Sequence, residues 1–159
     1  MCYEGTMLRT DRASRVIVAP PDRVFAALVD PDALAAWLPP AGMTGRFELF
    51  DARPGGSYRM VLTYADASTA PGKTTADSDV VEARFGDIVP GVRVVHAVKF
   101  VADDPDYAGT MTMTWAVTAT EDGTRVDIQA DDVPAGISEE DHVAGLASSL
   151  ANLAAHVER

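Results

Sequence analysis

The sequence predicts an α+β fold in which a curved antiparallel sheet of about seven strands surrounds a long C-terminal helix, with two short helices after the first strand. Three observations predict it. Residues 138–157 carry a helical apolar period, and residues 45–130 mostly alternate with the period of two that is typical of strands. Two short segments bounded by prolines follow the first strand, and each is long enough for about two helical turns.

The long helix is predicted at residues 138–157. Ser138 is suited to cap its start, Asp141 stands three residues later as in a capping box, and Glu139 and Glu140 favour the positive end of the helix dipole. The apolar residues recur at steps of three and four, at Val143, Leu146, Leu150, Leu153 and Val157. A helix about 30 Å long with so wide an apolar face needs a partner surface of similar length, and the strands before it make a curved sheet the expected partner.

The N-terminal elements are punctuated by prolines. A first strand is expected at residues 11–18 and ends before two consecutive prolines. Residues 22–29 predict a short helix, and residues 31–38 predict a second one, which two further prolines end.

The rest of the chain reads as consecutive hairpins. Strands are predicted at residues 45–49, 57–64, 79–85, 92–100, 110–120 and 124–130. Turns are predicted at residues 54–56, at Gly86-Asp87, at Pro90-Gly91 and at residues 121–123. A run of hairpins gives an antiparallel sheet. Residues 1–10 are expected to be a loose lead-in to a single domain at residues 11–159.

Composition narrows the function classes. The chain has 159 residues and a net charge of −11, which disfavours binding to nucleic acid or to an anionic membrane surface. No segment has the length and hydropathy of a membrane span, and the first residues do not resemble a signal peptide. Cys2 is the only cysteine, so no internal disulfide can form. We therefore expect a cytoplasmic protein that binds neither nucleic acid nor membrane.

No motif predicts catalysis, a metal or a cofactor. His142 and His156 are about 21 Å apart along the helix axis by helical rise, and nothing in the sequence pairs His96 with another donor. The serines in the middle of the long helix lie outside any nucleophile elbow. The glycines form no nucleotide-binding pattern. We expect no catalytic residue, no metal and no cofactor.

The order of elements resembles the helix-grip fold of the START-like (SRPBCC) superfamily, and the local sequence is similar to the branch of activator-of-heat-shock-protein-ATPase homologues. The matching segments are Val16-Ile17-Val18-Ala19-Pro20-Pro21, Val24-Phe25, Leu28, Asp30-Pro31, Leu34, Trp37-Leu38-Pro39-Pro40, Gly55-Gly56-Ser57-Tyr58-Arg59, Gly123-Thr124, His142-x-x-Gly145, Ser149-Leu150 and Leu153-Ala154. They span about residues 12–158. The resemblance implies a domain that carries a lipid or polyketide, acts as a cyclase or dehydratase, or assists a chaperone ATPase. Relatives often have Trp after the helix glycine, where this chain has Leu146, so a relative's ligand preference is not carried over.

We expect a cavity for a small apolar molecule between the sheet and the C-terminal helix, because a long sheet that curls around one helix need not close everywhere. The predicted lining is Trp37, Tyr58, Met60, Leu62, Met111, Met113, Trp115, Leu146 and Leu150. Each of these residues is also an ordinary core residue by pattern. Arg59, if turned inward, and His142 are the polar candidates to orient a ligand.

Three functions stay open on the sequence alone. A binding module requires a hydrophobic cavity, and it is the function we favour. A cyclase-like or dehydratase-like enzyme acting on a polyketide-type substrate requires polar groups that converge inside, with His142, His96 or Arg59 as candidates. A co-factor that stimulates a chaperone ATPase requires an exposed patch for a protein partner. A homodimer is also left open.

Overall fold

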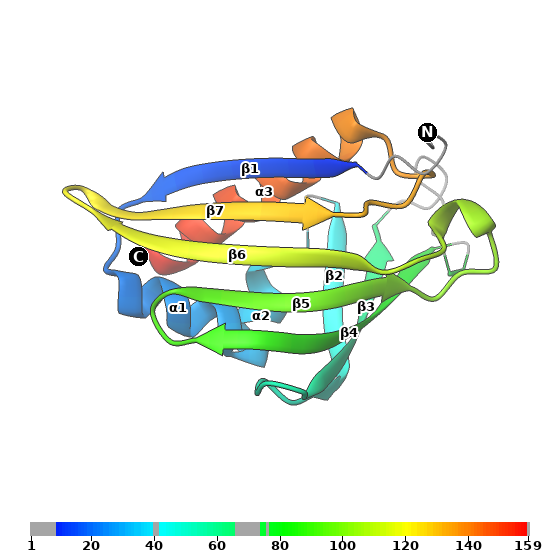
Figure 1. Ribbon diagram of the computed structural model, residues 1–159, viewed down its shortest axis with the longest axis horizontal. Helices are drawn as coiled ribbons and strands as arrows, with labels where there is room; N and C mark the ends of the chain where they lie inside the picture. The colour runs from blue at the N-terminus through cyan, green and yellow to red at the C-terminus, as the bar shows by residue number, and fades with distance from the viewer. Residues whose placement is uncertain (1–8, 40–41, 66–73, 76, 159) are drawn as a thin grey trace, which may run out of the picture.

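The computed structural model describes residues 9–39, 42–65, 74–75 and 77–158. One seven-stranded antiparallel sheet runs in the order β1-β7-β6-β5-β4-β3-β2 (Figure 1). Its strands are β1 (Thr10–Ile17), β2 (Met43–Phe50), β3 (Ser57–Tyr64), β4 (Ser78–Val89), β5 (Arg93–Phe100), β6 (Met111–Thr120) and β7 (Gly123–Asp131). The predicted α+β class, the antiparallel sheet and the order of elements are confirmed.

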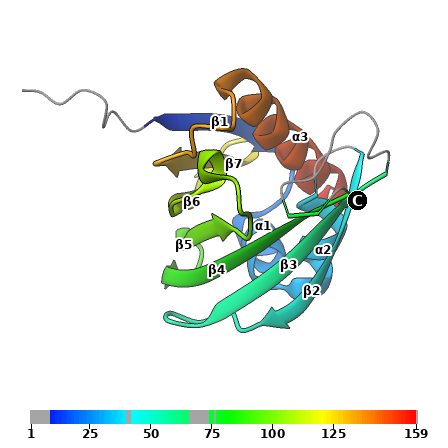
Figure 2. The same ribbon diagram turned by 90° about the vertical axis from the view of Figure 1, so that its right-hand side faces the viewer.

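The helices lie inside the curve of the sheet. They are α1 (Pro21–Val29), α2 (Pro31–Trp37) and α3 (Glu139–Val157). Figure 2 shows the sheet bending around them, with β1 beside α3 at one end and β2 beside α2 at the other. Proline begins both short helices, where its missing N–H costs no hydrogen bond. The Asp30 carboxylate caps α2 by accepting a hydrogen bond from the Asp32 N–H at 3.2 Å.

The long helix α3 packs against β1, α1 and α2. Its predicted cap is confirmed, because Ser138 Oγ accepts a hydrogen bond from the Asp141 N–H at 3.1 Å. Its buried apolar residues are Leu146, Leu150, Leu153, Ala154 and Val157. Two side chains also fasten α3 to the end of α2: Ser149 Oγ donates to the Leu38 carbonyl at 2.8 Å, and Asn152 Nδ2 donates to the Pro39 carbonyl at 3.0 Å.

We expect Ser138→Ala to lower the free energy of unfolding by about 1 kcal/mol, the usual value of an N-cap serine. Urea denaturation followed by far-UV circular dichroism measures this change. Ser14→Ala is the matched control, since Ser14 is exposed on β1 and caps no helix. A loss no larger than that of the control would mean that the cap does not stabilise α3.

Several predicted boundaries need correction. β4 continues to Val89 through the predicted turn at Gly86-Asp87, because a β-bulge between Phe85 and Ile88 bends the strand without ending it. β1 begins at Thr10, one residue before the predicted start of the first strand. A short 3-10 helix, Pro105–Tyr107, was not predicted. Residues 1–8 of the predicted lead-in, including Cys2, and residues 66–73 lie outside the described residues.

A single hydrophobic core fills the space between the concave face of the sheet and the three helices. Among its least exposed side chains are Ile17, Trp37, Met60, Ile128, Leu150 and Leu153. Within the described ranges, no helix combines the length and hydropathy that crossing a membrane requires.

Candidate functional site

A small, partly open cavity lies between the two short helices and the middle of the sheet. Its lining comes from α1, α2 and five strands: Leu28, Leu34, Trp37, Leu38, Phe47, Tyr58, Phe85, Val94, His96 and Trp115. The cavity measures about 20 Å³, which is room for about one water molecule. No residue of α3 lines it, and the buried apolar residues of α3 belong to the core. This cavity therefore lies beneath the short helices, and a ligand space beneath the C-terminal helix stays a prediction.

Three polar side chains are linked by two buried hydrogen bonds in the wall of this cavity. The Tyr58 hydroxyl lies 2.9 Å from His96 Nδ1, and Trp115 Nε1 donates to His96 Nε2 at 3.1 Å. All three side chains are buried. His96 lies on β5 between Tyr58 of β3 and Trp115 of β6, so the antiparallel register of the central strands assembles the group.

The indole of Trp115 fixes the tautomer of His96. An indole N–H can only donate, so His96 Nε2 must accept and carries no proton. In the neutral ring the proton is therefore on Nδ1, and Nδ1–H donates to the Tyr58 oxygen. The Tyr58 hydroxyl keeps its own proton, which is not used in either hydrogen bond.

Burial keeps this group uncharged. It lowers the pKa of His96 to about 4, because an imidazolium would lose its hydration there without gaining an anionic partner. Burial also raises the pKa of the Tyr58 hydroxyl well above its ordinary value. At neutral pH the cavity wall thus presents a neutral phenol and a neutral imidazole.

Aromatic rings surround the polar chain. Trp37 meets Trp115 edge to face, with ring centroids 5.3 Å apart, and Phe85 stacks on His96 at 6.0 Å. The Trp37 indole N–H donates to the Ala27 carbonyl at 2.9 Å, so its polar atom is already paired within the helical layer. The ring of Phe47 contacts Tyr58 edge to face at 5.5 Å. The cavity is therefore apolar apart from the Tyr58–His96 pair.

The structure brings only part of the predicted lining together. Trp37, Tyr58 and Trp115 line the cavity. The other predicted apolar residues pack in or against the core away from the cavity wall: Met60, Leu62, Met111, Met113, Leu146 and Leu150. That they contact a ligand stays a prediction.

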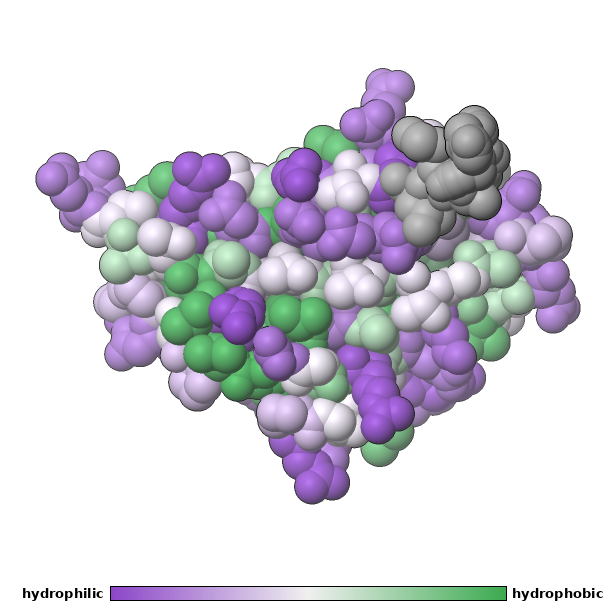
Figure 3. All heavy atoms as spheres, in the orientation of Figure 1, coloured by the Kyte–Doolittle hydropathy of each residue, from purple (hydrophilic) through white to green (hydrophobic). Residues whose placement is uncertain are grey.

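Arg59 does not turn inward, so the condition under which it would orient a ligand inside the fold is not met in this structure. Successive residues of a strand point to opposite faces, and Tyr58 takes the inner face. The Arg59 guanidinium pairs with Glu48 at 2.8 Å and with Glu82. Arg59 and Glu82 line an open hollow of about 460 Å³ on the outer face of β3, β4 and β5. Figure 3 shows much of this side of the molecule as hydrophilic, with hydrophobic residues gathered near the β4–β5 hairpin, where Val92 is exposed.

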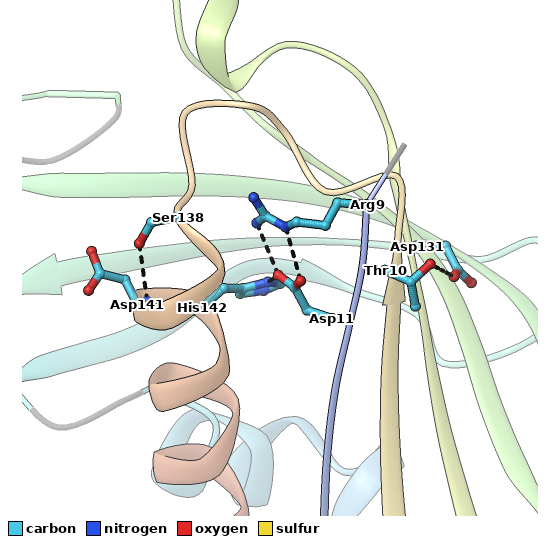
Figure 4. A network of polar contacts seen from close by, with 7 residues as sticks. All are labelled: Arg9, Thr10, Asp11, Asp131, Ser138, Asp141 and His142. Atoms are coloured by element: carbon cyan, nitrogen blue, oxygen red, sulfur yellow. Dashed lines mark hydrogen bonds and ion pairs between the residues drawn. The ribbon is translucent and has the colours of Figure 1, made fainter. Parts of the chain in front are cut away.

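His142 also points away from the cavity, because a buried carboxylate holds it. Its Nδ1 lies 2.7 Å from Asp11 Oδ2, and Arg9 makes two hydrogen bonds to the same carboxylate, at 2.9 and 3.0 Å (Figure 4). The Asp11 side chain is fully buried. Burial raises its pKa, but the hydrogen bonds and charges of Arg9 and His142 outweigh burial and leave the pKa below its ordinary value. The group ties β1 to the start of α3, and a role for His142 in orienting a ligand stays a prediction.

The sequence does not predict that the side chains of either polar group lie together. The two groups are Tyr58–His96–Trp115 and Arg9–Asp11–His142. His96, Tyr58 and Trp115 each fall on the inward face of a predicted strand, which is a usable signal. Their pairing depends on the register of β5 with β6, where Val94 faces Trp115, and the connection at residues 101–110 gives no turn that fixes this register. Asp11 carries no signal, since its partner His142 is 131 positions away.

Among the described residues, no three His, Cys, Asp or Glu side chains gather in a way that could hold a metal ion.

Comparison with known proteins shows which family this chain is similar to. The family model described as Activator of Hsp90 ATPase homolog 1-like protein matches residues 18–158. The crystal structure of protein CV1439 from Chromobacterium violaceum has a TM-score of 0.83 and 34% identity, and the match covers 94% of this chain and 97% of that one. A solution structure from Arthrobacter aurescens has a TM-score of 0.75 and 19% identity, and covers 94% of this chain and 86% of that one. No curated protein sequence is significantly similar to this chain.

Proposed function

The chain belongs to the family of Activator of Hsp90 ATPase homolog 1-like proteins, and on that premise we propose that it binds a small, mostly apolar molecule in the cavity beneath α1 and α2. The observation that carries this proposal is a mostly aromatic and aliphatic cavity wall that contains one neutral polar pair, Tyr58 and His96. Apolar lining with a few placed polar groups is the usual composition of a small-molecule site.

The size of the cavity determines how a ligand enters. At about 20 Å³ it holds no organic molecule without movement of side chains. Leu38 and Phe47 are the partly buried members of the lining, whereas the others are buried. Leu38 and Phe47 therefore form the mouth, and a ligand displaces them while the polar wall stays in place.

The same geometry favours binding over acid–base catalysis. The three candidates for a cyclase-like centre lie apart, with Arg59 on the outer face, His142 on Asp11 and His96 at the cavity. The remaining pair, Tyr58 and His96, has pKa values displaced away from neutrality by burial, which is the opposite of what proton transfer at neutral pH needs.

A second candidate function follows from the family description, which names activation of an Hsp90 ATPase. If the chain has this function, adding it to the chaperone raises the rate of ATP hydrolysis in proportion to complex formation. An unchanged rate at saturating protein would rule it out. The cytoplasmic location and the homodimer also remain predictions.

We expect saturable one-to-one binding of the neutral dye N-phenyl-1-naphthylamine, measured by dye fluorescence under direct excitation. Phe47→Ala should bind the dye about tenfold more tightly, because a displacement cost on the order of 1.4 kcal/mol is removed at the mouth. Leu38→Trp should weaken binding by a similar factor, because the larger side chain fills the entrance.

The control is Leu49→Trp, which adds the same ring at an exposed position of β2. It should bind the dye as the unmodified protein does. Wild-type protein without saturable binding, or equal losses in Leu38→Trp and Leu49→Trp, would contradict a site at this mouth.

A further inference from the structure

We infer that the molecule bound in this cavity carries an uncharged carbonyl oxygen, which accepts the hydroxyl proton of Tyr58. This inference rests on the function proposed above and specifies the chemical class of its ligand. The inference rests on the hydrogen-bonded row Trp115–His96–Tyr58, whose last member, Tyr58, lines the cavity.

Trp115 fixes the donor and acceptor of both hydrogen bonds in this row of side chains. Trp115 can only donate, so His96 accepts at Nε2 and donates at Nδ1. The Tyr58 oxygen therefore receives a hydrogen bond from His96, and the phenol cannot also donate its proton back to the same nitrogen. Two neighbouring side chains thus act as positioning residues for the hydroxyl.

The hydroxyl proton of Tyr58 is left for a partner in the cavity. Within the part of the chain that the structure describes, the contact with His96 Nδ1 is the sole hydrogen bond of the Tyr58 oxygen. Tyr58 is buried and its ring forms part of the cavity wall. A buried donor without an acceptor is unfavourable, so a ligand oxygen that takes this proton gains more than the same oxygen gains from solvent.

The rest of the lining determines that the acceptor is uncharged. No Lys or Arg side chain lines the cavity, so a carboxylate or phosphate would be desolvated without a counter-charge. A ketone, ester or amide carbonyl accepts one strong hydrogen bond at little desolvation cost. Its apolar remainder fits the surrounding tryptophan and phenylalanine rings.

A matched pair of probes tests the inference. 2-Acetylnaphthalene and 2-isopropenylnaphthalene have nearly the same shape, but only the first has a carbonyl oxygen. We expect the ketone to bind wild-type protein about tenfold more tightly than the alkene, the factor that corresponds to about 1.4 kcal/mol, the size of one net hydrogen bond. The ratio of the two dissociation constants should fall to near one in Tyr58→Phe.

Tyr64→Phe is the control, since Tyr64 lies on the same strand and donates to Asp79, away from the cavity. It should keep the tenfold preference. Infrared spectroscopy gives a readout that needs no variant: the carbonyl stretch of the bound ketone should lie below its frequency in an alkane. Equal binding of both probes to wild type, or a preference that persists in Tyr58→Phe, would overturn the carbonyl assignment and leave the binding site standing. Failure of both probes to bind would overturn the proposed function as well.

Discussion

Replacing Trp37 with alanine is expected to lower the free energy of unfolding by about 3–5 kcal/mol, the largest single effect that we predict. Trp37 is 1% exposed, and it joins the helical layer to the sheet through its edge contact with Trp115. Its removal leaves a void that the neighbouring helices cannot close without losing contacts. It also leaves the Ala27 carbonyl without its 2.9 Å donor.

Urea denaturation followed by far-UV circular dichroism measures this loss without relying on tryptophan emission. Trp37→Phe is the matched control, because it keeps most of the aromatic volume and loses only the indole N–H. We expect it to cost about 1–2 kcal/mol, near the value of one buried hydrogen bond with a small packing defect. An equal loss in the free energy of unfolding for the two variants would show that the ring volume of Trp37 does not stabilise the packing of α2 over the sheet.

Acidification from pH 6.5 to pH 4 is expected to remove up to about 3 kcal/mol of stability through His96. Burial holds the pKa of His96 at about 4 in the folded chain, whereas an unfolded histidine titrates near 6.5. The unfolded state therefore binds more protons in this interval, so stability falls as the pH falls through it and levels off below pH 4. Asp11 adds a separate loss at lower pH, because its pKa is lowered in the folded state.

Urea midpoints at pH 7.0, 5.5 and 4.5 test this dependence. His96→Gln should flatten the profile across this range, since no imidazole then has to stay neutral in the core. His156→Gln is the control, because that histidine lies in the last turn of α3 outside the core cluster, and the variant should keep the wild-type slope. A His96→Gln profile as steep as that of the wild type would contradict the neutral buried imidazole.

Local patterns were sufficient to predict the fold. The apolar stripe of α3 with its cap at Ser138 is a short-range signal, and so are the prolines that begin α1 and α2. The boundary errors occurred where tertiary pairing overrides such signals. At Gly86-Asp87 a turn-like dipeptide continues a strand, because β5 supplies hydrogen-bond partners on both sides of the bulge.

The site could be predicted only in part, because its residues come from different elements. Tyr58, Trp37 and Trp115 were identified by their size and their inward position on predicted elements. The place of the cavity depends on how α1 and α2 pack over the sheet, which no periodicity encodes. His142 is a candidate because it lies near the start of the long helix, and no local pattern predicts its contact with Asp11 on a distant strand.

A ligand site beneath the short helices is tested most directly by the two indole N–H signals of the protein. The chain has two tryptophans, Trp37 and Trp115, and both line the cavity. In a ¹H–¹⁵N spectrum recorded during titration with 2-acetylnaphthalene, both indole signals should shift together and saturate at one equivalent. Unchanged indole signals, with shifts confined to residues between α3 and β1, would place any bound molecule elsewhere and contradict this site.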